Sequence, residues 1–280
     1  MSVRTTCLVG VDGSGPSRAA VRWACIAADA LDWRLVFAHF LPASATLAEE
    51  RAASDFLVET AANHPDARLV IERGDVVEGL AGLASSGDVI AVGTHKTGFV
   101  RGRALGSLGI RLAARSPRSI AVIPDGQFAS RRDVVLGVGP TVATDHALLA
   151  AGAAATALHQ DLMLLHVSVP GREDDAERAH ERLADASAAA IAHYPDLVVR
   201  SRVVNRASSD GLLDASRSAS LLVLDSNRST SATIGPVTHD VLMNLGSPVL
   251  LSRVDSSRAE DPVAPLPPKR DRENVVSAGA

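Results

Sequence analysis

Three short stretches of the sequence carry residues that suit a ligand bearing phosphate groups. Asp12 follows an apolar run and precedes the turn-forming residues Gly13–Pro16, while Gly93 ends a second apolar run. Gly106 and Ser107 begin a helical pattern thirteen positions after Gly93. Glycine lets the backbone come close to a ligand, and a helix N-terminus offers free N–H groups and a positive dipole to phosphates. The acidic side chain can hydrogen-bond a ribose hydroxyl or an adenine edge.

Each of these residues also has a purely structural interpretation. Glycines after strands are usually turn residues, and an aspartate before Gly-Ser often forms the turn that enters a helix. The loop between Gly93 and Gly106 adds a chemical argument, because it carries Lys96, Arg101 and Arg103, three cations that suit an anionic ligand. Taken together on one α/β unit, the stretches favour a phosphate-bearing ligand.

Other nucleotide and catalytic motifs are absent from the sequence. No GxxxxGK[ST] segment occurs, and Gly13-Ser14-Gly15 lacks the third glycine of GxGxxG, as does the later pair of Gly137 and Gly139. The nine histidines show no metal-ligand spacing, and neither HExxH nor GxSxG is present. A P-loop NTPase, a Rossmann dinucleotide site, a metal centre and a hydrolase nucleophile are therefore not expected.

The composition argues against further classes of protein. Aromatic residues make up 3% and the formal net charge is −4, so a nucleic-acid reader is not expected. No apolar run reaches the length of about 18 residues that would suggest a transmembrane helix. A strand-like run begins within a few residues of the N-terminus, which leaves no room for a signal peptide. The two cysteines, Cys7 and Cys25, are expected to be core thiols. We expect a cytoplasmic protein with no nucleic-acid or membrane partner.

Similar segments recur along the chain at a nearly constant separation. Leu8–Asp12 and Val135–Gly139 lie 127 positions apart, as do His39 and His166. Later landmarks keep the same order, which indicates a duplicated domain of about 125 residues. The two histidines end equivalent strands, and we expect them to fill a shared structural niche.

Within each copy, short apolar runs alternate with longer helical patterns, which predicts an α/β fold with an open, doubly wound parallel sheet. In the first copy we expect strands at Thr6–Asp12, Arg34–Phe40, Arg68–Glu72, Val89–Val92 and Ile120–Ile123. The helices between them are expected at Pro16–Leu31, Ala45–Asn63, Val76–Ala84 and Ser107–Arg115. In the second copy, strands are expected at Val134–Val138, Asp161–Val167, Leu197–Val204, Leu221–Leu224 and Val249–Leu251.

The repeat divides the chain into two domains, which we expect at residues 1–124 and 133–252. The polar and charged residues 125–132 are expected to form the linker. The stretch 253–280 contains four prolines and many charges without periodicity, which predicts a disordered tail.

These residues resemble the universal stress protein family in its tandem-domain form. Val9–Ser14 resembles the first strand of that family, Val92–Ser107 resembles its ATP motif Gly-x2-Gly-x9-Gly-Ser/Thr, and Ser116–Ile123 resembles its closing helix-to-strand joint. The resemblance covers about residues 4–251. It implies two tandem flavodoxin-like (Rossmann-like) sheets in the strand order 3-2-1-4-5. It also implies that the two copies form an intramolecular pseudo-dimer through their last strands, and that two chains can pair as a homodimer.

The resemblance also implies a ligand and a role. The ligand would be ATP or a related adenine nucleotide, with the presence of Mg²⁺ left open. The protein would be non-enzymatic and would act in stress response through contacts with partners. By resemblance, Val11, Phe40 and Val92 would flank the adenine, and the backbone at Ser107 and Leu108 would meet the phosphates.

Lys96 departs from the family motif, because it stands where the motif has its second glycine. Its side chain either blocks the approach of the chain to a phosphate or contacts the phosphates directly, so a ligand-free interaction scaffold is the alternative function. A weak ATPase is disfavoured, since no general base or Mg²⁺ cluster is evident beside the motif. Binding of a cyclic nucleotide remains open.

The second copy departs further from the motif. Gly139 stands at the position of Asp12, and Asp225 stands at the position of Gly93. The helix start is followed by Pro236, which removes an N–H that would bind phosphate. We therefore expect the second copy to serve as a pairing partner without binding ATP.

Overall fold

The computed structural model describes residues 4–85, 87–95, 108–126, 128, 130–139, 145–168, 173–226 and 234–253, with the backbone alone at 173–177. The first half of the chain contains strands β1 (Thr6–Gly10), β2 (Arg34–Leu41), β3 (Arg68–Arg73), β4 (Val89–Thr94) and β5 (Ser119–Pro124). The second half contains β6 (Val134–Gly137), β7 (Leu162–Ser168), β8 (Val199–Asn205), β9 (Leu221–Asp225) and β10 (Val249–Ser252).

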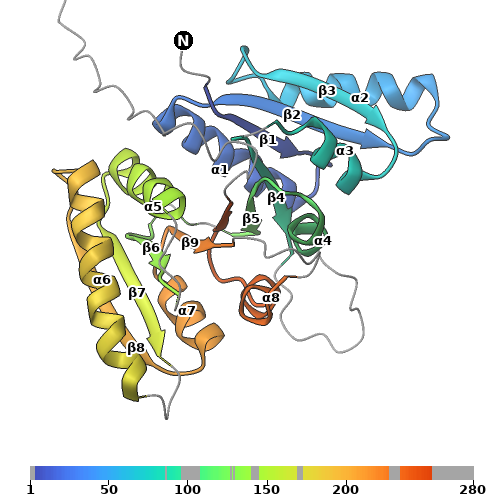
Figure 1. Cartoon of the computed structure of the whole chain (residues 1–280). Helices are drawn as coiled ribbons and strands as arrows, with labels where there is room; N and C mark the ends of the chain where they lie inside the picture. Colours follow the sequence, from blue (N-terminus) through green and yellow to red (C-terminus); the bar gives the residue numbers. More distant parts are fainter. Residues whose placement is uncertain are drawn as a thin grey trace, which may run out of the picture.

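Helices alternate with these strands in both halves (Figure 1). The first half has α1 (Gly15–Leu31), α2 (Leu47–Thr60), α3 (Val76–Leu83) and α4 (Leu108–Arg115). The second half has α5 (Asp145–Leu158), α6 (Glu173–His193), α7 (Ser208–Ser216) and α8 (Pro236–Met243). The α/β class predicted from the sequence is confirmed, and the element bounds differ from the expected ones by three residues or fewer.

All ten strands join one sheet in the order β3-β2-β1-β4-β5-β10-β9-β6-β7-β8. Every neighbouring pair is parallel except β5 with β10, which pair antiparallel through Val122 with Val249, Ala121 with Leu250, and Ile120 with Leu251. When the strands of each half are numbered from 1 to 5 along the chain, both halves have the order 3-2-1-4-5. The two halves meet edge to edge at the centre of the molecule (Figure 1).

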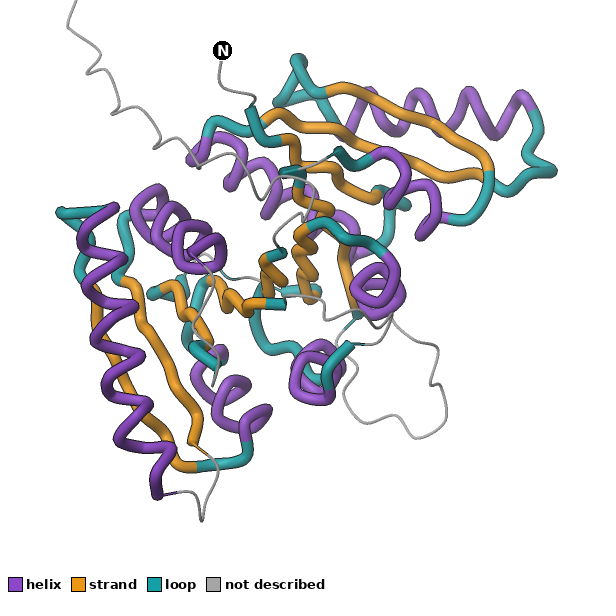
Figure 2. The backbone as a smooth tube through the Cα atoms, viewed as in Figure 1, coloured by secondary structure: helices purple, strands orange, loops and turns teal. Residues whose placement is uncertain are grey.

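Helices cover both faces of this sheet (Figure 2). One apolar cluster packs α1, α2, α5 and α6 on one face, and a second packs α3, α4, α7 and α8 on the other. Alternate residues of β1 face the two clusters: Val9 belongs to the first and Leu8 to the second, and both are buried. Burial on both faces explains why these strands read as continuous apolar runs.

Local capping accounts for the helix starts. The Ser14 hydroxyl accepts a hydrogen bond from Ser17 N at 3.2 Å and caps α1. Helix α2 begins two residues later than expected, because Thr46 and Glu49 form a capping box that leaves Ala45 outside the helix. Asp75 caps α3 by accepting hydrogen bonds from two backbone N–H groups of its first turn.

The linker and Arg253 are packed against the rest of the protein. In the linker, Arg131 Nη1 donates to the Gly246 carbonyl at 2.5 Å, and the guanidinium carbon of Arg131 lies 4.9 Å from the centre of the Phe128 ring. Arg253, which the sequence analysis assigned to the tail, is 5% exposed and donates a hydrogen bond to the Ala113 carbonyl, so this residue is packed within the protein. Residues 254–280 lie outside the described part of the chain.

Candidate functional site

The predicted site lies at the carboxyl ends of β1, β2 and β4, which are neighbours in the sheet. Helices following β1 and β4 cover opposite faces, and the strand order reverses between these two parallel strands. Open α/β sheets bind ligands at such a point. Asp12 follows β1, Phe40 is near the end of β2, and Gly93 is near the end of β4. The structure thus brings together residues that are far apart in the sequence.

Asp12 is a polar residue exposed at this edge. Its Oδ1 accepts a hydrogen bond from Ser14 N at 2.9 Å, and its own N–H donates to the Ser17 hydroxyl at 3.1 Å. Partial burial raises the pKa of Asp12, but hydrogen bonds from Ser14 and Ser17 outweigh this effect and hold the pKa below its ordinary value. The carboxylate is therefore ionised at neutral pH and oriented by its neighbours, as an acceptor for ligand hydroxyls should be.

The hydroxyls of Ser14 and Ser17 were not among the predicted site residues. Both shape the turn between β1 and α1, where Gly13 has a φ of 78° that glycine adopts without steric cost. The sequence contained a signal for them, because serines three residues apart at the start of a helical pattern suit an N-cap.

Gly93 is required by a contact that the sequence did not reveal. A Cβ atom at this position would lie 2.1 Å from the Pro16 carbonyl oxygen and 2.7 Å from Ser17 N. The first turn of α1 therefore crosses directly over the end of β4, at a distance that only glycine permits. Gly93 has a structural role here, whatever ligand approaches it.

The three residues expected to flank an adenine differ in exposure. Val92 is fully buried and Val11 is 4% exposed, so neither side chain reaches solvent as the chain stands. The Val11 N–H donates to the Ala38 carbonyl at 2.9 Å. Phe40 is half-buried, and its ring lies so close to α3 that a Cβ on Gly79 would come within 2.0 Å of it.

Leu108 begins α4, whereas Lys96, Gly106 and Ser107 lie outside the described residues. Two ion pairs connect α4 to α3. Arg111 Nη2 lies 2.9 Å from the Asp75 carboxylate, and Arg115 pairs with Glu78. These contacts fix one side of the helix whose N-terminus belongs to the predicted phosphate motif.

The two histidines occupy equivalent places, as expected from the repeat. His39 Nδ1 lies 2.7 Å from the Val11 carbonyl oxygen, and His166 Nδ1 lies 2.9 Å from the Val138 carbonyl oxygen. Each imidazole joins the end of the second strand of its half to the residue after the first strand. The interpretation of a shared structural niche is confirmed.

The equivalent edge of the second half has different chemistry. Gly139 follows β6 where Asp12 follows β1, and Asp225 ends β9. His146 in the first turn of α5 shares a hydrogen bond of 2.8 Å with the Ser252 hydroxyl at the end of β10. Burial lowers the pKa of His146, and the nearby Asp225 carboxylate partly opposes this effect. A carboxylate thus stands where the first half has Gly93, and a histidine from the first turn of α5 lies near it.

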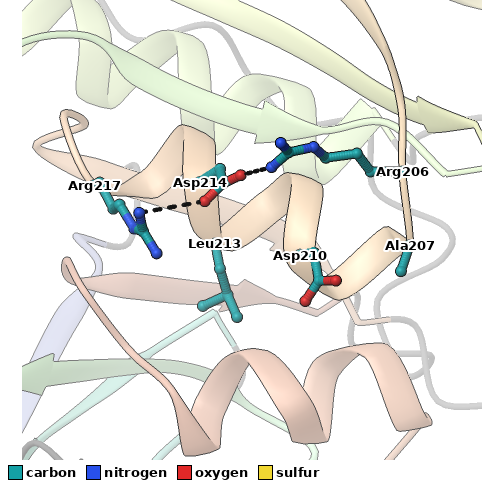
Figure 3. A pocket seen from close by; sticks show the side chains of 6 residues that line it. All are labelled: Arg206, Ala207, Asp210, Leu213, Asp214 and Arg217. Atoms are coloured by element: carbon teal, nitrogen blue, oxygen red, sulfur yellow. Dashed lines mark hydrogen bonds and ion pairs between the residues drawn. The ribbon is translucent and has the colours of Figure 1, made fainter.

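A pocket of 370 Å³ lies along α7, lined by Arg206, Ala207, Asp210, Leu213, Asp214 and Arg217 (Figure 3). Asp214 forms ion pairs with both arginines, and with Asp210 the lining has two carboxylates for its two guanidinium groups. None of the predicted site residues lines this pocket. We therefore place the candidate site at the carboxyl ends of the strands of the first half.

Within the described part of the chain, no three His, Cys, Asp or Glu residues gather closely enough to hold a metal ion. No helix among the same residues has the length and apolar character needed to cross a bilayer.

Comparison with known proteins agrees with the fold. Residues 4–124 match the model of the universal stress protein family. A curated universal stress protein of Mycolicibacterium smegmatis is 28% identical over 284 residues, covering 88% of this chain and 96% of the relative. A universal stress protein of Archaeoglobus fulgidus superposes with a TM-score of 0.66 at 15% identity, covering 90% of this chain and 97% of that structure. A Pseudomonas aeruginosa protein of unknown function superposes with a TM-score of 0.58 at 15% identity, covering 90% and 94%. The universal stress protein family is therefore what residues 4–124 of this chain resemble, and the extent of the match to the Mycolicibacterium smegmatis protein fits a tandem-domain protein.

Proposed function

We propose that the first half of the chain binds one adenine nucleotide, with ATP as the expected ligand, and that the protein acts in stress response without catalysing a reaction. The observation that carries this proposal is the ionised, exposed Asp12 at the point where the strand order of the sheet reverses. A hydrogen bond from the Ser14 N–H to its carboxylate, a hydrogen bond from its own N–H to the Ser17 hydroxyl, and the turn at Gly13 orient it. Such an arrangement suits recognition of a ribose.

The residues of this edge fit the parts of a nucleotide. Asp12 accepts hydrogen bonds from ribose hydroxyls, and the ring of Phe40 forms an apolar border for the base opposite the backbone of Val11. Gly93 leaves the end of β4 without a side chain. The N-terminus of α4 at Leu108 offers N–H groups to phosphates, together with Ser107, Gly106 and Lys96 by the family motif.

The second half is proposed to serve as the pairing partner of the first. Asp225 places a carboxylate where phosphates would have to approach, and repulsion of like charges opposes their binding. Pro236 at the start of α8 removes one N–H from the helix N-terminus. In this proposal, domain 1–124 binds the ligand and domain 133–252 pairs with domain 1–124. Ligand binding alters contacts with partner proteins or with a second chain.

The test is a parallel titration of the full-length protein with ATP, ADP, AMP and cyclic AMP, followed by calorimetry. We expect one site per chain for at least one of them. Asp12→Asn should weaken that binding about tenfold or more, because a hydrogen bond to a charged group is lost. Asp210→Asn, which removes an exposed carboxylate from the second half, is the matched control and should leave affinity unchanged.

Absence of binding to all four nucleotides at millimolar concentration would refute the proposal. Lys96→Gly then tests the alternative function, a ligand-free interaction scaffold. If Lys96 blocks the site in such a scaffold, this variant should gain nucleotide binding. Equal affinity of wild-type protein and Asp12→Asn would show that the site lies elsewhere.

A further inference from the structure

Arg253 is a buried arginine from the second half that reaches into the first half. It follows β10 directly, is 5% exposed, and donates through Nη2 to the Ala113 carbonyl at 2.5 Å and through Nη1 to the Ser116 carbonyl. Its backbone N–H donates to the Ser119 hydroxyl at 3.1 Å. Both carbonyls belong to the C-terminal end of α4 or the residue that follows it.

The sequence of α4 explains why this end needs an outside donor. In an α-helix, the carbonyl of Ala113 would accept from the N–H of the residue four positions later. That residue is Pro117, which has no N–H, so the carbonyl has no intrahelical partner. A guanidinium supplies two donors in a fixed fork, and its positive charge also suits the negative end of the helix dipole.

Arg253 therefore holds one end of a short helix whose other end faces the proposed ligand. Helix α4 has 8 residues and a length of about 12 Å, so its two ends move together. Its side is fixed by the ion pairs of Arg111 and Arg115 with α3, and Gly109 packs closely on β5. The C-terminal end is the part that depends on the second half of the chain.

We propose that Arg253 is a positioning residue for the nucleotide site. It sets the place of the α4 N-terminus relative to the phosphates, so that the second half completes the site of the first. This inference rests on the proposed nucleotide binding. It adds that the tandem arrangement is needed for phosphate recognition, although the second half contacts no phosphate.

The test compares ATP with adenosine in the full-length protein. Adenosine contacts only the ribose and base part of the site, whereas ATP also needs the α4 N-terminus. Arg253→Ala and Arg253→Lys should weaken ATP binding about fivefold or more and leave adenosine binding unchanged. Lysine keeps the charge but cannot present two donors in a fork.

Arg131→Ala is the matched control. Arg131 also donates to two backbone carbonyls, those of Gly246 and Ser216, but both belong to the second half. This variant should lower thermal stability and leave the ratio of ATP to adenosine affinity unchanged. Amide hydrogen exchange in residues 108–115 should rise in Arg253→Lys without nucleotide and stay at the wild-type level in Arg131→Ala.

Several results would overturn the inference while leaving the proposed function intact. These are unchanged ATP affinity in both Arg253 variants, equal losses for ATP and adenosine, or an equal loss in Arg131→Ala. If Arg253→Ala does not fold, Arg253→Lys carries the same comparison. If the wild-type protein binds neither ligand, both the proposed function and this inference fail. Unchanged exchange in Arg253→Lys would also refute the positioning of α4.

Discussion

Gly93→Ala should destabilise the protein strongly, because the added methyl group would meet backbone and not a flexible side chain. Its Cβ would lie 2.1 Å from the Pro16 carbonyl oxygen, 2.2 Å from the Pro16 carbonyl carbon and 2.7 Å from Ser17 N. This steric clash can be relieved only if the first turn of α1 moves away from β4. Overpacking of this kind costs about 1–3 kcal/mol, and the value should lie near the upper limit because no side chain can rotate away.

A loss of about 3 kcal/mol corresponds to a fall in melting temperature of about 6–12 °C for a chain of this size. Thermal and urea unfolding of Gly93→Ala measure the loss directly. Gly82→Ala is the matched control, because a Cβ at Gly82 of α3 meets nothing within 4 Å and alanine favours the helix by about 1 kcal/mol. Wild-type stability of Gly93→Ala would refute the contact between α1 and β4.

Two further predictions concern titratable groups. Burial lowers the pKa of His146, so the native state holds it neutral while the unfolded chain takes up a proton as the pH falls below 6.5. The stability that this group contributes is full above pH 6.5 and is lost at lower pH, so His146→Gln should flatten the pH dependence of the free energy of unfolding between about pH 7 and 5. An unchanged slope would argue against the burial of His146. Burial, with a smaller contribution from Asp29, raises the pKa of the Cys25 thiol to about 11, and burial also raises the pKa of Cys7. A disulfide reagent at neutral pH should therefore label the native protein much more slowly than the unfolded chain, with Cys25 reacting before the fully buried Cys7; rapid labelling of Cys7 would contradict the structure.

The sequence predicted those features that depend on short-range patterns. The buried strands are readable because each is an apolar run of a few residues, and the duplication is readable because landmarks recur in order. His39 and His166 illustrate the strength of this reasoning, because their place in the repeat predicted a shared structural niche and the structure gives them equivalent hydrogen bonds. The repeat did not predict which backbone carbonyl each imidazole contacts.

Contacts between distant residues were not predictable in the same way. Gly93 suggested an approach to a ligand, but nothing in its surroundings revealed that Pro16 and Ser17 lie against it. Arg253 stands beside a charged, proline-rich stretch and was therefore assigned to the tail, although the missing N–H of Pro117 creates a need for its guanidinium. Both cases depend on the pairing of β5 with β10 or the packing of α1 on β4, which spacing alone does not encode.

The two halves share the backbone arrangement at the ends of their strands but differ in the side chains that lie there. The Val138 N–H donates to the Leu165 carbonyl at 2.8 Å, as the Val11 N–H does to Ala38, so the strand ends are built alike. At the helices the halves differ, because Asp240 and Asn244 of the second half stand at the positions of Arg111 and Arg115 when counted from Gly235 and Gly106. The second half keeps the fold although it lacks the residues of the predicted ligand site. This implies that the second half contributes something other than ligand binding. The structure shows two such contributions, and both act on the first half. Strand β10 pairs antiparallel with β5, and Arg253 donates a hydrogen bond to the Ala113 carbonyl of α4.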